Sequence, residues 1–124
     1  MNMNQKHLLS YKYSIRGIRL ALSIDQNMRI HFASAVAVIL TNYFLDISRT
    51  DWLFSLILIG LVLMAETFNT AIEKLADHVS QERHPLIAQT KDMAAGAVMI
   101  VCIFAAICAI LIYTPYLMNG KRIA

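Results

Sequence analysis

One short stretch of the chain, AETFNTAIEKLAD (residues 65–77), carries oxygen-bearing side chains at regular helical spacing. On a helix that advances about 100° per residue, Glu66, Asn69, Glu73 and Asp77 share one face about 80° wide. Carboxylate and amide oxygens placed this way suit a Mg²⁺ ion that also binds phosphate, and a carboxylate can accept a proton from a reacting hydroxyl. The pattern therefore predicts a site of phosphate chemistry on one helix face.

The acidic face begins inside an apolar segment, because the preceding run from Trp52 to Met64 has no charged residue. An ionised, unpaired carboxylate within a membrane span is costly, so such residues usually mark function. The structural alternative is a helix end whose acids simply reach water. That alternative stays open for Asp77 and is weaker for Glu73 and Glu66, which lie progressively deeper.

A second cluster, TKD at residues 90–92, opens the next apolar run. Lys91 can neutralise phosphate charge, and Asp92 can orient the lysine or add an acceptor. The alternative is a helix start capped by Thr90 or Asp92, with Lys91 as a flanking cation. Neither GxxxxGK[ST] nor GxGxxG occurs, which excludes the usual glycine-rich nucleotide loops.

The elements that must position these residues are predicted to be membrane helices. The 124 residues are 58% hydrophobic and 15% charged, with a mean hydropathy of +0.56. A soluble domain of this size cannot bury so much apolar surface. Three blocks approach the roughly 20 residues that span a bilayer. We expect one all-α membrane domain over residues 1–124, with spans at about 29–46, 51–77 and 92–115.

The segment before the first span, about residues 7–24, is predicted to be an amphipathic helix on the membrane surface. Its apolar residues recur every three or four positions, and its basic residues take the other side. Placing the N-terminus in the cytosol puts eight of the eleven basic residues on the cytosolic side. The three on the outer side are Arg49, Lys121 and Arg122. We expect a bacterial cytoplasmic (inner) membrane location.

The chain resembles the prokaryotic integral-membrane diacylglycerol kinase family, which includes the undecaprenol kinases. The resemblance is carried by two segments, AETFNTAIEKLAD and the later AQTKDMAAGAV. The shared signature is E-x-x-N-[ST]-A-I-E, then K-D about 18 residues after the last glutamate. YSIRGIR (residues 13–19) and the order of helices extend the likeness over nearly the whole chain. The resemblance implies a homotrimer that phosphorylates a lipid alcohol with ATP and Mg²⁺ at the cytosolic boundary, with no nucleic acid as a partner.

Residue roles follow from the resemblance by position. Glu66 is similar to the family's general base and Asn69 to a polar group beside it, while Glu73 is similar to a metal ligand. The residues that resemble the nucleotide side of the site are Tyr13, Asp77, His84, Lys91 and Asp92. By residue type alone, an interfacial aromatic anchor is the favoured interpretation of Tyr13, and His84 is equally a solvated loop histidine.

Two positions depart from the usual family pattern. Asp25 stands where a second metal carboxylate is usually glutamate, and its side chain is shorter by about 1.5 Å. Ala95 lies where diacylglycerol kinases can have serine, and KDMAAGAV together with NMRIH is closer to undecaprenol kinases. Diacylglycerol and undecaprenol both remain possible substrates.

Two other functions compete with a kinase. A small ion-coupled transporter would use Glu66 as its proton carrier, but such proteins usually show internal repeats and a mid-membrane acid. A non-catalytic membrane oligomer would explain the small residues of the last span but would leave the acidic face without a use.

Overall fold

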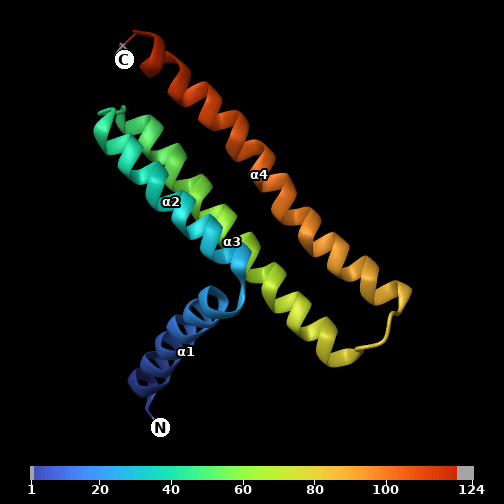
Figure 1. Ribbon diagram of the computed structural model, residues 1–124. Coiled ribbons are helices and arrows are strands. Elements are labelled where there is room, and N and C mark those ends of the chain that lie inside the picture. The colour runs from blue at the N-terminus through green and yellow to red at the C-terminus, as the bar shows by residue number, and fades with distance from the viewer. Residues whose placement is uncertain (1, 120–124) are drawn as a thin grey trace.

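The computed structural model describes residues 2–119, which form four α-helices and contain no strand (Figure 1). They are α1 (Met3–Ile24), α2 (Gln26–Phe44), α3 (Arg49–Val79) and α4 (Pro85–Asn119). The predicted all-α class is confirmed for this part of the chain. Lys121 and Arg122, which were counted on the outer side, lie outside the described residues.

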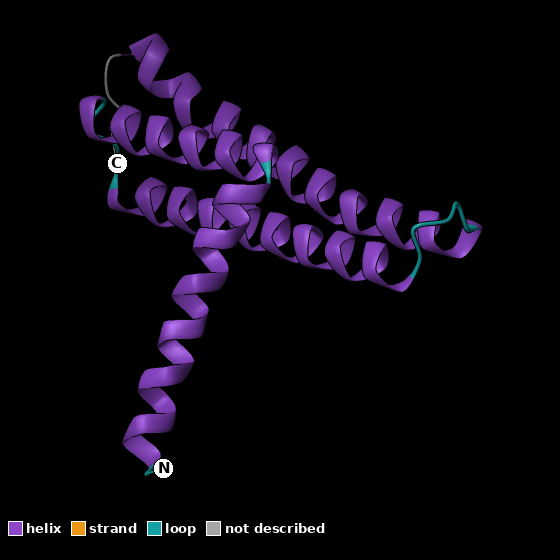
Figure 2. Cartoon of the chain, turned by 60° about the horizontal axis from the view of Figure 1, so that its bottom comes forward, coloured by secondary structure: helices purple, strands orange, loops and turns teal. Residues whose placement is uncertain are grey.

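Helix α1 stands away from the other three helices (Figure 2). It starts four residues before the predicted boundary because Asn2 caps it, with Gln5 completing a capping box. It ends where Asp25 adopts an extended conformation and begins α2 as its N-cap. Arg29 of α2 donates to the carbonyls of Leu22 and Ser23, at 3.0 and 3.1 Å, and so satisfies the end of α1.

Helices α2 and α3 form an antiparallel pair, and α4 packs against α3 (Figure 1). The turn between α2 and α3 reverses the chain with Asp46 at a φ of 49°, a conformation that aspartate tolerates better than most residues. Ser48 then caps α3, accepting from the backbone N–H of Asp51 at 3.1 Å. This arrangement places residues 66–77 on the half of α3 that is remote from the turn.

The connection between α3 and α4 differs from the sequence expectation. A loop was predicted from about 78 to 90, with TKD at the start of the next helix, but α4 already begins at Pro85. Proline is favoured in the first turn, and the His84 Nδ1 accepts from the backbone N–H of Leu86 at 3.2 Å. Thr90 is therefore no cap: its hydroxyl donates to the Leu86 carbonyl within α4 at 2.9 Å.

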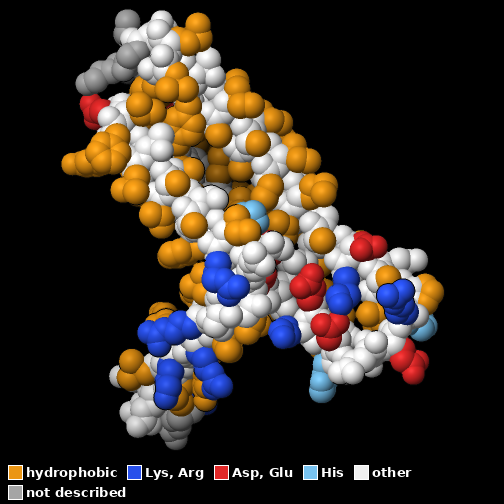
Figure 3. Space-filling view, in the orientation of Figure 1, with side chains coloured by type: hydrophobic (Ala, Val, Ile, Leu, Met, Phe, Trp, Pro, Cys, Tyr) orange, Lys and Arg blue, Asp and Glu red, His pale blue; other side chains and the backbone are white. Residues whose placement is uncertain are grey.

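Large apolar side chains cover much of the described surface, and charged side chains gather at α1 and at the α3–α4 connection (Figure 3). Two of the described helices, α3 and α4, are long and apolar enough to cross a membrane. Helix α2 forms as expected but is not one of these two candidate spans. Its first turns are too polar, because they contain Gln26, Asn27, Arg29 and His31. The third span therefore remains a prediction.

At the end of the bundle near the α2–α3 turn lies a group of buried and half-buried polar side chains, which we call the distal network: Asn42, Ser48, Asp51, Tyr113 and Tyr116. The Tyr116 hydroxyl accepts from the Ser48 N–H and donates to Asp51 Oδ2, both at 2.8 Å. The Tyr113 hydroxyl donates to Asn42 Oδ1 at 2.5 Å. These bonds tie α4 to the α2–α3 pair.

Candidate functional site

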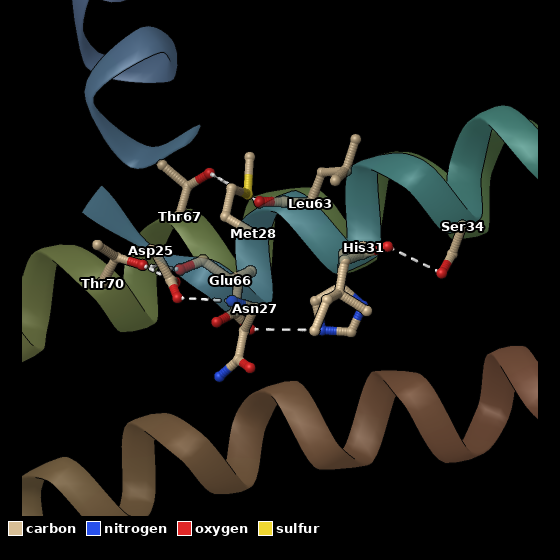
Figure 4. Close-up of polar contacts among 10 residues, drawn as sticks. Asp25, Asn27, Met28, His31, Ser34, Leu63, Glu66, Thr67 and Thr70 are labelled. Carbon is tan, nitrogen blue, oxygen red and sulfur yellow. Dashed lines mark hydrogen bonds and ion pairs between the residues drawn. The ribbon is translucent and has the colours of Figure 1, made fainter. Parts of the chain in front are cut away.

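Glu66 is the most deeply buried acid of the predicted site, with 1% of its surface exposed. It lies on α3 and faces α2, where the His31 Nε2 is 3.7 Å from its Oε2 (Figure 4). In the described chain, Glu66 Oε1 is buried and makes no hydrogen bond. Buried polar atoms are normally satisfied, so an open carboxylate oxygen points to a partner outside the chain.

Asp25, at the junction of α1 and α2, reaches the same part of α3 (Figure 4). Its Oδ2 accepts from the Thr70 hydroxyl at 2.6 Å, and its Oδ1 accepts from the backbone N–H of Asn27 at 2.9 Å. Thr70 is one helical turn from Glu66. The break between α1 and α2 therefore brings a second carboxyl group beside Glu66.

The hydrogen bonds of Asp25 favour its ionised form. Partial burial opposes ionisation, but the bond from Thr70, an interaction with the Glu66 side chain and backbone bonds at the start of α2 lower the pKa of Asp25 below its ordinary value. A carboxylate that stays ionised is what a divalent cation requires.

Asn69 and Glu73 continue the acidic face of α3 toward the α3–α4 connection. Asn69 is 6% exposed, and its Oδ1 is a second buried atom without a hydrogen-bond partner among the described residues. Glu73 is half-buried, and its charge acts on both Glu66 and Lys91. Glu73 thus connects the buried and the exposed parts of the site.

The exposed part of the site is a hollow at the α3–α4 connection. The Lys91 Nζ lies 2.7 Å from Asp77 Oδ1, which links α4 to α3. Both residues and His84 line a hollow of about 450 Å³. The structure therefore brings together three of the five residues that were expected on the nucleotide side.

The other two expected nucleotide-side residues are not part of this hollow. Tyr13 is 61% exposed on α1, beside a shallow depression lined by α1 residues alone. Asp92 is exposed on α4, and the lining of the hollow does not include it. A single described chain therefore does not bring either side chain into the hollow.

The fit of the site to a divalent cation rests on two carboxylates. No group of three or more His, Cys, Asp or Glu side chains converges within residues 2–119. Mg²⁺ in phosphate chemistry usually takes only one or two carboxylates, with phosphate oxygens and water completing its shell. Asp25 and Glu73 both act electrostatically on Glu66, so they are the carboxylates that would hold such an ion.

Two residues of the site had no role in the sequence prediction. His31 contacts Glu66, and Thr70 bonds Asp25. A histidine inside an apolar block was a signal for the first, because ionisable residues in such blocks are rare. Helical spacing puts Thr70 about 40° from Glu66 on the same face of α3, but its bond to Asp25 depends on where the α1–α2 junction lies.

Most of the chain is similar to known proteins. A family model described as prokaryotic diacylglycerol kinase matches residues 12–113. The chain is 34% identical over 108 residues to the undecaprenol kinase of Bacillus subtilis (strain 168), covering 87% of this chain and 88% of that protein. It is 34% identical over 113 residues to the diacylglycerol kinase of Synechocystis sp., covering 90% of this chain and 65% of that protein.

The diacylglycerol kinase of Escherichia coli (strain K12) is also similar. It is 30% identical over 95 residues, which cover 77% of this chain and 78% of that protein. The matched range of the family model contains Asp25, Glu66, Glu73 and Lys91. The chain therefore belongs to the prokaryotic diacylglycerol kinase family of lipid kinases.

Proposed function

We propose that the protein transfers the γ-phosphoryl group of ATP to the hydroxyl of a membrane lipid, with Mg²⁺, at the cytosolic face of the membrane. The observation that carries this proposal is the buried Glu66 carboxylate, whose Oε1 makes no bond within the described chain. It lies on the same helix face as Glu73 and Asp77, which lead to the hollow at Lys91. A buried base on a helix face that leads to a polar, cation-bearing hollow suits a lipid hydroxyl and a nucleotide.

Glu66 acts as the general base in this proposal. As the lipid oxygen attacks the γ-phosphorus, its proton passes to Glu66 Oε1, a new P–O bond forms and the bond to the ADP oxygen breaks. Asn69 Oδ1, which is also buried without a partner, lies close enough along α3 to orient a reacting group. The transfer is direct and in line, without a phosphorylated protein.

Asp25 and Glu73 are the proposed Mg²⁺ ligands. When bound, Mg²⁺ neutralises phosphate charge and draws electrons from the bond that breaks. Asp25 brings its carboxylate from the α1–α2 junction, and Glu73 brings its own from α3. The bond from Thr70 holds Asp25 in place for this role.

The nucleotide is proposed to bind at the hollow lined by Asp77, His84 and Lys91. Lys91 offers a cation to the phosphates, and its ion pair with Asp77 fixes the direction of the ammonium group. Tyr13 and Asp92 belong to the nucleotide side only if another element approaches them. A neighbouring subunit of a homotrimer is such an element.

The wider arrangement is also part of the proposal. We place the protein in the bacterial cytoplasmic (inner) membrane with a cytosolic N-terminus, α1 on the membrane surface and α2 as a third span. The apolar side chains exposed on α2, α3 and α4 support contact with lipid or with two further copies of the chain. The basic residues of α1 suit lipid phosphates.

Two lipid alcohols are candidates, because one relative is named an undecaprenol kinase and others diacylglycerol kinases. The test is transfer of labelled γ-phosphate from Mg-ATP in detergent–lipid micelles, with each alcohol supplied separately and Glu66→Gln as the blank. Transfer to either lipid, absent in the blank, supports the kinase and identifies the substrate. Transfer to neither by folded protein overturns the proposal, and ATP-independent proton flux in vesicles then supports the transporter.

A further inference from the structure

An apolar cavity of about 190 Å³ lies between α2, α3 and α4, close to Glu66. Its lining combines aliphatic side chains with a few polar ones, and His31 is the polar residue at the end that meets Glu66. The His31 side chain is 23% exposed, whereas that of Glu66 is 2% exposed. His31 therefore stands at the boundary between the open cavity and the enclosed carboxylate.

The hydroxyl groups that line the cavity, those of Ser34, Ser55 and Tyr113, are bonded within the protein, and the Tyr113 hydroxyl donates to Asn42 Oδ1. The Ser34 hydroxyl donates to the Ile30 carbonyl at 2.9 Å, and the Ser55 hydroxyl donates to the Asp51 carbonyl at 2.8 Å. Cys102 is a weak donor only. His31 is thus the strong hydrogen-bonding group of this lining that turns toward Glu66.

Glu66 needs such a partner, because its other charged neighbours are acids. Asp25 and Glu73 both repel its negative charge. Among the described residues, His31 is the basic side chain within 4.0 Å of Glu66. The contact reaches Oε2 and leaves Oε1 open. The side chains of Asp25 and Asn69 also act on Glu66, and His31 adds the contact at Oε2. A base has to be held within a few tenths of an ångström of its working position, so each contact that fixes the carboxylate matters.

We propose that His31 is a positioning residue for Glu66: its Nε2–H directs the carboxylate through Oε2, so that Oε1 faces the lipid hydroxyl at the cavity end. This inference rests on the proposed kinase function. The imidazole does not touch the lipid or ATP and exchanges no proton with them. The proton of the lipid hydroxyl goes to Glu66 Oε1, as described above.

The test uses two variants of His31 and a matched control in the full-length protein. His31→Gln keeps an N–H donor near the Nε2 position, whereas His31→Met keeps the bulk and removes the donor. His7→Met makes the same change at an exposed histidine of α1. Each purified protein is assayed for γ-phosphate transfer from Mg-ATP, using whichever of diacylglycerol and undecaprenol the unaltered protein phosphorylates. The kcat, the KM for lipid and the KM for ATP are all measured.

We expect His31→Met to lower kcat about a hundredfold, the cost of a reacting group displaced by about 1 Å, with the KM for ATP unchanged. His31→Gln should recover most of the loss, and His7→Met should match the unaltered protein. A folded His31→Met variant with normal kcat overturns the inference. So does a folded His31→Gln variant as impaired as His31→Met, because a role limited to packing does not depend on the donor. If the unaltered protein transfers no phosphate, the proposed function fails instead.

Discussion

The two halves of α3 each bury an acid, and the two carboxylates differ in their hydrogen bonds. At the distal network, Asp51 is 3% exposed and its Oδ2 accepts from both the Ser48 and Tyr116 hydroxyls at 2.8 Å. In the half of α3 remote from the turn, Glu66 is 1% exposed, its nearest basic partner is 3.7 Å away and one oxygen has no hydrogen bond. Burial alone therefore does not distinguish a structural acid from a reactive one.

The difference lies in how the carboxylate oxygens are occupied. A buried carboxylate that accepts short hydrogen bonds stabilises the fold, because its charge is offset by fixed donors. A buried carboxylate with an open oxygen is costly, and folding does not explain it. We infer that Asp51 serves stability and that Glu66 serves turnover. Substitutions in the two halves of α3 should separate the effect on stability from the effect on turnover.

The largest effect is expected at Glu66. Glu66→Gln keeps the size of the side chain and removes the base, so kcat should fall by about 10²–10⁴. The free energy of unfolding should stay the same or rise, because a buried charge is removed. The measurements are γ-phosphate transfer in mixed micelles and denaturant unfolding of the same samples. A variant with normal turnover would remove Glu66 from the mechanism.

The second effect concerns Asp25, which combines both kinds of role. Asp25→Asn keeps a side-chain oxygen to cap α2 but removes the charge proposed to bind Mg²⁺. The Mg²⁺ concentration that gives half-maximal transfer should rise by about tenfold or more. Titration of Mg²⁺ at saturating lipid measures this shift. An unchanged Mg²⁺ dependence, with α-helical content preserved, would leave Asp25 with its capping role only.

The distal network should show the reverse pattern. Tyr116→Phe removes the hydroxyl that bonds Ser48 and Asp51, leaving buried polar groups without this partner, at a cost of about 1–3 kcal/mol in unfolding free energy. Turnover per folded molecule should not change. Denaturant unfolding in micelles measures the loss, and Tyr43→Phe, at an exposed tyrosine of α2, is the control. A large fall in kcat would contradict the division between a stabilising half of α3 and a reactive one.

Much of the fold followed from local sequence patterns. Helical spacing placed Glu66, Asn69, Glu73 and Asp77 on one face of a helix, and α3 is one unbroken helix over all four. Hydropathy identified the α3 and α4 segments as long apolar helices. Such patterns succeed because each depends on residues a few positions apart.

What could not be predicted depends on contacts between distant segments. The Thr70–Asp25 bond joins residues 45 positions apart, and the His31–Glu66 contact joins α2 to α3. Both depend on where the chain breaks between α1 and α2, which the extended conformation of Asp25 fixes. The early start of α4 at Pro85 was missed for a different reason, since the TKD cluster looked like a helix start and the proline did not.

The smallest effect is expected at the exposed part of the site, where a contact is present but surrounded by water. Asp77→Asn breaks the 2.7 Å ion pair with Lys91, and solvent and salt screen such exposed pairs, so stability should not change measurably. The freed ammonium group loses its fixed direction, so the KM for ATP should rise several-fold while kcat and the KM for lipid stay constant. Raising the ionic strength should shrink the difference between the two proteins. A loss of kcat comparable to that of Glu66→Gln would instead place Asp77 with the reactive acids and extend the open, working end of α3 out to the cytosolic surface.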